Sequence, residues 1–174
     1  MMRQLRSPRR AQRGTALIVS LVLLLVLTIL GISSMRTSGL QERMAGNLHD
    51  AHLAFQAAEA ALREAERFLG SASLPEFTNS NGLYVYDPTD PTNPDPVWKD
   101  PNWHLTKARV YEGTLNGVST PPRYVIEELP TVTLPGQSAA ADEPLPEMTI
   151  YRVTAWARGG SDASEVILQS TYMR

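Results

Sequence analysis

The longest apolar stretch of the chain lies near its beginning. Residues 14–35 read GTALIVSLVLLLVLTILGISSM and carry no charged side chain. As a helix these 22 residues are roughly 33 Å long, about the thickness of the hydrocarbon core of a bilayer. Because the run from Leu21 to Leu27 is apolar on every side, it predicts a membrane span rather than the core helix of a soluble domain. A cleaved secretory signal is disfavoured, since the run is long and no small-x-small site follows it closely.

Beyond Met35 the pattern becomes two-sided, with an apolar stripe and a charged face. The apolar residues recur at spacings of three and four, which is the period of an α-helix. They are Leu40, Met44, Leu48, Ala51, Phe55, Ala58, Leu62, Ala65 and Leu69. Gly70 is a typical stop signal. We therefore expect one continuous helix of about 55 residues, whose part from Ala51 to Leu69 packs under a sheet.

Residues 71–174 have a different character, because prolines from Pro75 to Pro146 preclude long helices. A small-residue loop at Gly136–Pro146 is expected to be mobile. The turn signal Gly159-Gly160-Ser161-Asp162 predicts a β-hairpin. The predicted fold class is therefore α+β, a long helix, membrane-spanning and then amphipathic, packed against a small antiparallel β-sheet head. The strand-like runs are Leu83–Tyr86, Ala108–Glu112, Tyr124–Leu129, Thr149–Ala157 and Glu165–Tyr172.

Charge is divided unevenly along the chain. Five of the 16 Lys and Arg residues fall within the first 14 residues, which contain no Asp or Glu. The rest of the chain has 11 basic against 18 acidic residues, and such an acidic body argues against nucleic acid as a partner. The basic leader places the N-terminus in the cytosol. The chain has no cysteine, which excludes disulfides and thiolate chemistry.

Two segments carry a resemblance to a known family. An Arg-rich leader that ends at Gly14, followed by an apolar run that continues into an amphipathic helix, looks like a type IV prepilin. The segment LQERMAGNLHDAHLAFQAAEAALREAE (Leu40–Glu66) closely resembles the N-terminal region of PilX-type minor pilins. The segment YRVTAWARGGSDASEVILQSTY (Tyr151–Tyr172) is similar to the end of those proteins.

The resemblance implies a division of the chain and a life history. Residues 1–14 are a prepilin leader, 15–39 the transmembrane and filament-core half of the helix, 40–70 its amphipathic half, and 71–174 the globular head. A prepilin peptidase cuts between Gly14 and Thr15, and the new amine of Thr15 is methylated. The subunit leaves the inner membrane of a Gram-negative bacterium, where its head is periplasmic, and joins a surface filament. Its implied partners are other minor and major pilins and the inner-membrane assembly platform, in pili that serve cell adhesion and twitching motility.

One residue departs from the pilin pattern. Typical pilins have a Glu at the fifth residue after the cut, and counting from Thr15 that residue is Val19. The Glu is thought to neutralise the amine of a neighbouring subunit, which would otherwise be a buried unpaired charge. Our hypothesis is that a subunit with Val19 occupies the filament tip and helps initiate assembly. Tip pseudopilins of type II secretion filaments show the same omission and are the nearest alternative.

The head offers few residues for chemistry. Asp87, Asp90 and Asp95 in the proline-rich loop are weak calcium candidates, but their spacing is not that of an EF-hand, and a solvated loop is the simpler interpretation. His49 and His52 share a helix face, yet no metalloprotease motif surrounds them. We expect neither an enzyme nor a cofactor. A signal-anchored periplasmic binding module is the alternative from a different class.

Overall fold

The computed structural model describes residues 13–91, 94–133 and 147–174. The predicted leader up to residue 12 and most of the predicted loop at Gly136–Pro146 lie outside these ranges. The described chain divides into two compact units, one ending at Gly46 and one beginning at Asn47. Its elements are α1 (Arg13–Leu69), β1 (Leu83–Val85), η1 (Val97–Lys99), α2 (Trp103–Thr106), β2 (Arg109–Val110), β3 (Arg123–Thr133), β4 (Glu147–Arg158) and β5 (Glu165–Met173).

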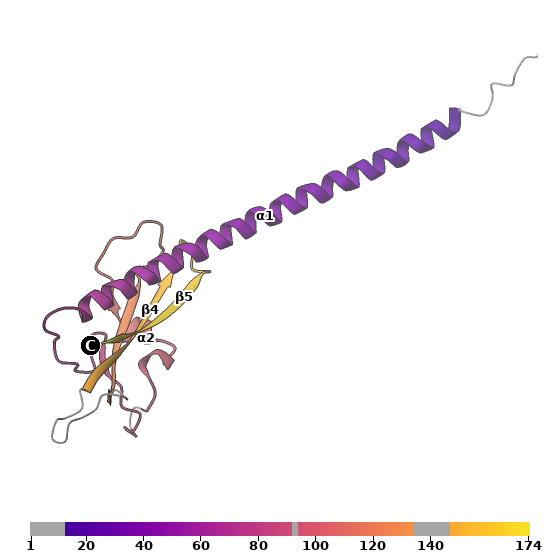
Figure 1. The fold of residues 1–174 in the computed structure, drawn as a ribbon. Helices are drawn as coiled ribbons and strands as arrows, with labels where there is room; N and C mark the ends of the chain where they lie inside the picture. Colours follow the sequence, from indigo (N-terminus) through magenta and orange to yellow (C-terminus); the bar gives the residue numbers. More distant parts are fainter. Residues whose placement is uncertain (1–12, 92–93, 134–146) are drawn as a thin grey trace, which may run out of the picture. The chain divides into compact units, whose positions relative to one another are not determined.

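The helix α1 confirms the prediction of one continuous element (Figure 1). It has 57 residues and ends one residue before Gly70, whose amide bonds the carbonyl of Glu66 at 2.9 Å. Most of the predicted stripe meets the sheet, since Ala58, Leu62, Ala65 and Leu69 are buried, but Phe55 is 46% exposed. The prediction that Phe55 packs under the sheet is therefore wrong. The helix buries mostly alanines there: Ala54, Ala57, Ala58, Ala61 and Ala65.

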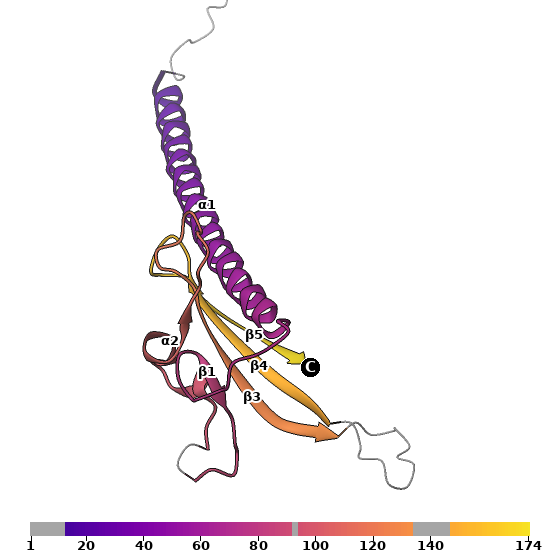
Figure 2. The same ribbon diagram turned by 90° about the vertical axis from the view of Figure 1, so that its left-hand side faces the viewer.

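The sheet has the order β1-β3-β4-β5 (Figure 2). β2 pairs with the same edge of β3 as β1. β3, β4 and β5 are antiparallel neighbours, which confirms the predicted hairpin between the last two strands. One pairing departs from the expectation of an antiparallel sheet, since β1 runs parallel to β3. A parallel neighbour requires a connection that crosses over, and the long segment from β1 to β3, which carries η1, α2 and β2, supplies it.

Each face of the sheet carries a buried cluster. On one face Leu62 and Leu69 of α1 pack against Ile126 of β3 and Val153 of β4 in the main core. On the opposite face a second cluster contains Val97 of η1, Trp103 of α2, Val125 and Trp156. Side chains alternate along each strand, so β3 and β4 supply residues to both clusters. The head is thus held together by a long helix on one side and two short helical turns on the other.

Candidate assembly surface

The apolar part of α1 exposes its side chains in every direction. Leu17, Leu24 and Met35 are all exposed, as is each other large apolar residue between them. An 18-residue window of this helix has a mean hydropathy of 2.9 and is 0% buried within the chain. By length and composition α1 is long and apolar enough to cross a membrane. An exposed apolar surface of this size marks a site of contact with lipid or with other proteins.

Several hydroxyl groups of this helix bond carbonyl groups of the helix itself. Ser20 Oγ donates to the carbonyl of Leu17 at 2.9 Å, and Thr28 Oγ1 donates to that of Leu25 at 2.7 Å. Further along, Thr37 Oγ1 bonds a carbonyl four residues back at 3.0 Å. A polar group without a hydrogen-bond partner costs roughly 2–7 kcal/mol in a hydrocarbon environment. These bonds let the segment carry polar residues and still be accommodated in lipid or in a helix bundle.

The residues of the predicted processing site lie at the start of α1. Gly14 and Thr15 belong to the first turn of the helix, and Val19 follows one turn later with 57% of its surface exposed. Val19 is one more apolar side chain on a helix that is apolar all round. Cleavage between Gly14 and Thr15, and methylation of Thr15, stay predictions.

The β4–β5 turn is attached to α1 through Asp50. Asp50 Oδ1 accepts the backbone N–H of Ser161 at 2.9 Å, and Oδ2 accepts its hydroxyl at 2.6 Å. Hydrogen bonds from Ser161 and Ser164 lower the pKa of Asp50 from 3.8 to about 2. A side chain on Gly159 would collide with the backbone carbonyl and carboxylate of Asp50. The glycine that marks the turn in the sequence therefore also permits the close approach of the helix, which no sequence pattern indicated.

The end of α1 is held by the last residue of the chain. Arg174 donates from Nη1 to the carbonyl of Leu69 and from Nη2 to that of Ala72, both at 3.1 Å. One helical turn earlier, Glu66 accepts the hydroxyl of Ser170 at 2.9 Å. The last carbonyls of a helix have no intrahelical partner, so a guanidinium is a suitable cap. Neither contact could be predicted, because the partners are about a hundred residues apart in the chain.

A buried ion pair attaches the proline-rich loop to the other face of the sheet. Glu127 is 1% exposed and accepts Arg152 Nε at 2.9 Å across the β3–β4 pair. Its second oxygen accepts the backbone N–H of Val97 at 2.7 Å, which fixes η1. The guanidinium of Arg152 also lies 4.9 Å from the ring centroid of Tyr86. One carboxylate thus joins two strands to the loop that contains the calcium candidates.

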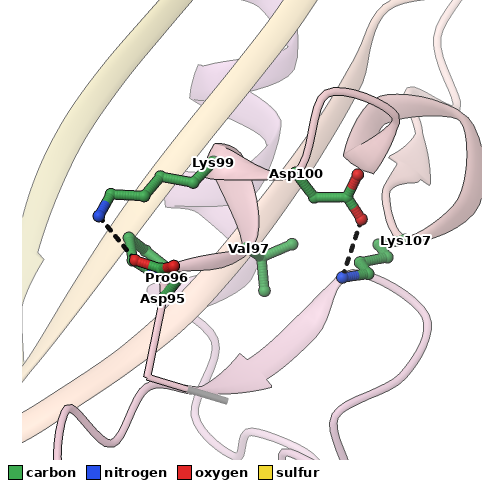
Figure 3. A pocket seen from close by; sticks show the side chains of 6 residues that line it. All are labelled: Asp95, Pro96, Val97, Lys99, Asp100 and Lys107. Atoms are coloured by element: carbon green, nitrogen blue, oxygen red, sulfur yellow. Dashed lines mark hydrogen bonds and ion pairs between the residues drawn. The ribbon is translucent and has the colours of Figure 1, made fainter.

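A pocket of about 230 Å³ opens beside this loop. Pro96, Val97 and the residues of two ion pairs line it. Lys99 Nζ lies 2.7 Å from Asp95 Oδ1, and Lys107 Nζ lies 3.1 Å from Asp100 Oδ2. Figure 3 shows these pairs on either side of Val97. The candidate Asp95 is therefore engaged with an ammonium group rather than directed at a shared metal position.

The other two calcium candidates stabilise the loop itself. Asp87 accepts the backbone N–H of Thr89 at 2.8 Å and its hydroxyl at 2.6 Å, and these bonds lower the pKa of Asp87. The amide of Asp90 bonds the carbonyl of Asp87 at 3.2 Å. Within residues 13–91, 94–133 and 147–174, no three His, Asp or Glu side chains come together in a way that could hold a metal ion. Calcium binding stays a prediction that this geometry does not favour.

Trp103, His104 and Trp156 pack together in the head. Trp103 is buried in the second cluster, whereas Trp98 is 39% exposed. His104 stacks on Trp156 with ring centroids 4.4 Å apart, and burial lowers the pKa of this histidine. His49 and His52 are exposed on α1. Stacking on a core tryptophan explains His104 without a ligand.

Comparison with known protein families matches nearly the whole described chain. The family "PilX N-terminal" matches residues 13–63, which is the greater part of α1. The family "Type IV pilus assembly protein PilX C-term" matches residues 71–174, which is the head. No curated protein and no solved structure matches. The boundary between the two matches falls at the end of α1, where the predicted helix gives way to the predicted head. The chain therefore belongs to the PilX family and is a minor pilin, a structural component of the type IV pilus.

Proposed function

We propose that this minor pilin helps to initiate type IV pilus assembly and sits at or near the filament tip after processing by a prepilin peptidase. The observation that carries the proposal is the apolar segment of α1, which has no partner within the described chain and is exposed on every side. A subunit that only needed an anchor would not need this helix to continue into its head. Here the anchor and the head share one helix from Arg13 to Leu69.

The first step is insertion into the inner membrane. The five arginines before Thr15 stay in the cytosol, so the head is periplasmic. The peptidase then cuts between Gly14 and Thr15, and glycine on one side of the bond gives it access to the backbone. Removal of the leader takes away the charges that resist extraction from the bilayer. The processed N-terminus is the methylated amine of Thr15.

The second step is transfer of the helix from lipid to the filament. A helix that is apolar on all sides, and whose Ser20 and Thr28 hydroxyls bond its own carbonyls, is stable in either environment, because neither offers or requires hydrogen bonds. The exposed Leu48 and Phe55 extend an apolar surface along the helix within the head unit. We propose that these side chains pack against other minor and major pilins, while the assembly platform drives the transfer.

The tip position rests on Val19. With no carboxylate at this position, the subunit cannot neutralise the amine of a subunit placed before it. A tip subunit has no such neighbour, so the valine does no harm there. Farther down the shaft, the same valine would leave one buried amine without a counter-charge.

Processing is tested by the N-terminal mass and sequence of the protein from cells with and without an intact prepilin peptidase. We expect a chain that begins at N-methylated Thr15 only when the peptidase is present. Gly14→Val should block the cut, whereas the matched Gly39→Val should not, since a side chain at Gly39 meets nothing within 4 Å. A chain that begins at Met1 or Met2 in both strains would instead be a static anchor, as in the binding-module alternative.

The tip position is tested separately, by labelling the subunit on sheared pili and by the variant Val19→Glu. We expect label at filament ends, and initiation that is unchanged or impaired by the new carboxylate. A large increase of Val19→Glu protein along the shaft would contradict the tip position but leave membership of the pilus intact. Absence from sheared pili, with normal processing, would instead favour a secretion filament.

A further inference from the structure

The two edges of the sheet differ in how well they are protected. On the side of β3 away from β4 the edge strands are short, since β1 has three residues and β2 has two. On the other side β5 has nine residues, all in regular register with β4. Among the described residues no strand lies beyond β5. A long regular edge strand is a template for pairing with another chain, and short edge strands are one way in which proteins avoid it.

The register shows which groups of β5 face the open edge. Thr149 and Arg174 exchange both backbone hydrogen bonds at 3.0 Å, so alternate residues of β5 bond to β4 in the same way. The residues between them direct N–H and C=O away from β4. These are Glu165, Ile167, Gln169, Thr171 and Met173, and the side chains of all five are exposed on the sheet face opposite α1.

β5 lacks the features that usually keep an edge strand from pairing with another chain. β5 contains no proline, no lysine and no bulge, and its one charged residue, Glu165, stands at its beginning. Two of its outward residues are large and apolar, with Ile167 53% and Met173 59% exposed. Exposed apolar side chains and unpaired backbone groups thus coincide on one edge, which is the combination that strand addition uses.

We propose that the β5 edge pairs with the β5 edge of a second copy of this chain, antiparallel and centred on Gln169. In this register all five outward residues find a partner, so the number of backbone hydrogen bonds is at its maximum. Glu165 lies opposite Met173 of the other copy, and the two Glu165 side chains stay at opposite ends of the ribbon. Ile167 lies diagonal to Met173 of the other copy, so each exposed apolar side chain covers another.

The pairing has a directional consequence. β5 runs in the same direction as α1 within the head, because Asp50 contacts Ser161 near the start of the strand and Glu66 contacts Ser170 farther along. Antiparallel strands therefore place the two head-unit segments of α1 in opposite directions. This inference does not depend on the tip position or on processing.

Disulfide trapping tests the register directly, because the full chain has no cysteine of its own. In an antiparallel hydrogen-bonded pair the Cα atoms are about 5.5 Å apart, within the roughly 4.4–6.8 Å that a disulfide spans. We expect Gln169→Cys in the full chain, in detergent micelles under mild oxidation, to form a disulfide dimer. Ile167→Cys alone should not, whereas a mixture of Ile167→Cys and Thr171→Cys chains should. Equal trapping at all three positions, or none at Gln169, would overturn the proposal.

A charge on the edge provides the second test. Ile167→Lys, in the Gln169→Cys background, should abolish the disulfide dimer, because lysine on an edge opposes pairing. Leu105→Lys is the matched control, since Leu105 is similarly exposed on α2, and it should leave the dimer intact. If Ile167→Lys does not fold, as judged by tryptophan emission, Thr171→Lys replaces it. A dimer that survives the lysine on the edge would have to arise elsewhere, for example between the apolar helices, and the proposal would be wrong.

Discussion

Replacing Glu127 with leucine should destabilise the head by several kcal/mol. The carboxylate is buried, and it has two partners from different parts of the chain, Arg152 and the amide of Val97. Leucine has a similar volume but can accept neither hydrogen bond. The variant leaves the guanidinium of Arg152, itself only 17% exposed, without its carboxylate.

The size of the effect follows from these two losses. Removing one partner of a buried ion pair costs about 3–5 kcal/mol, because a charge stays buried without compensation. In the double variant Glu127→Leu with Arg152→Met, both charges are gone and only the amide of Val97 lacks its acceptor. An unsatisfied buried amide costs about 1–3 kcal/mol, so the double variant should be the more stable of the two. Whole domains are stable by only about 5–15 kcal/mol, so the single change is severe.

Tryptophan emission during denaturant unfolding reports this loss locally. Trp103 and Trp156 lie in the same buried cluster as Val97, the residue that Glu127 holds. We expect a red-shifted emission and a lower unfolding midpoint for Glu127→Leu, measured on the processed chain in detergent micelles. Glu127→Gln keeps an acceptor for Val97 and should fall between the single variant and the unaltered protein.

A matched control separates the ion pair from general effects of leucine on β3. Glu128 is the next residue on the strand and is only half-buried, so Glu128→Leu should change stability by about 0.5 kcal/mol or less. If Glu127→Leu costs less than about 1 kcal/mol, the buried pair does not hold the loop. If the double variant is no more stable than the single one, the unpaired guanidinium is not the cause of the loss.

Three further changes test the contacts that hold the head on α1. Folding lowers the pKa of Asp50, so the stability that the Asp50 carboxylate contributes is complete above its ordinary pKa of 3.8 and is lost as pH falls toward about 2. Amide hydrogen exchange at Ser161 should therefore become faster between these two pH values. Asp50→Asn should remove this pH dependence. Gly159→Ala should destabilise the head by about 1–3 kcal/mol in thermal unfolding, because the new methyl group collides with the α1 backbone, whereas Gly46→Ala should be neutral or stabilising. Arg174→Ala should cost about 1 kcal/mol and increase amide exchange after the end of α1, and unchanged exchange there would contradict its capping role.

Local patterns were enough to predict the long helix and the strands of this fold, but not the short helices η1 and α2. Uncharged residues from 14 to 35 and apolar spacings of three and four predicted α1 almost to its last residue. Alternation and the Gly159-Gly160 turn predicted β4 and β5 and their antiparallel pairing. These features are encoded by neighbours in the sequence, so periodicity and turn chemistry reveal them. The parallel pairing of β1 with β3 was not predictable in this way, because it depends on the path of the segment between them.

The contacts that organise the head could not be predicted either, because they join residues that are far apart in the sequence. Asp50 and Ser161, or Arg174 and Leu69, are joined only after the chain has folded, and each residue alone looks like an ordinary polar surface residue. Glu127 sits in a strand-like run where a charged residue would be expected to face solvent. Its burial depends on the loop that carries Val97, which lies thirty residues earlier in the chain.

Phe55 is the large apolar residue of the predicted stripe that does not face the sheet. Hydrophobicity ranks Phe55 above any alanine, so it was expected to be buried with Ala58, Leu62, Ala65 and Leu69. Packing depends on how closely the backbones approach, and Ala54, Ala58 and Ala61 let α1 lie close to β4 and to the glycines of the turn. Leu62 and Leu69 reach the core farther along the helix, whereas Leu48 and Phe55 stay exposed, where another molecule or lipid could cover them. Hydrophobicity alone therefore does not separate the apolar residues that pack within the head from those that are left exposed on its helix.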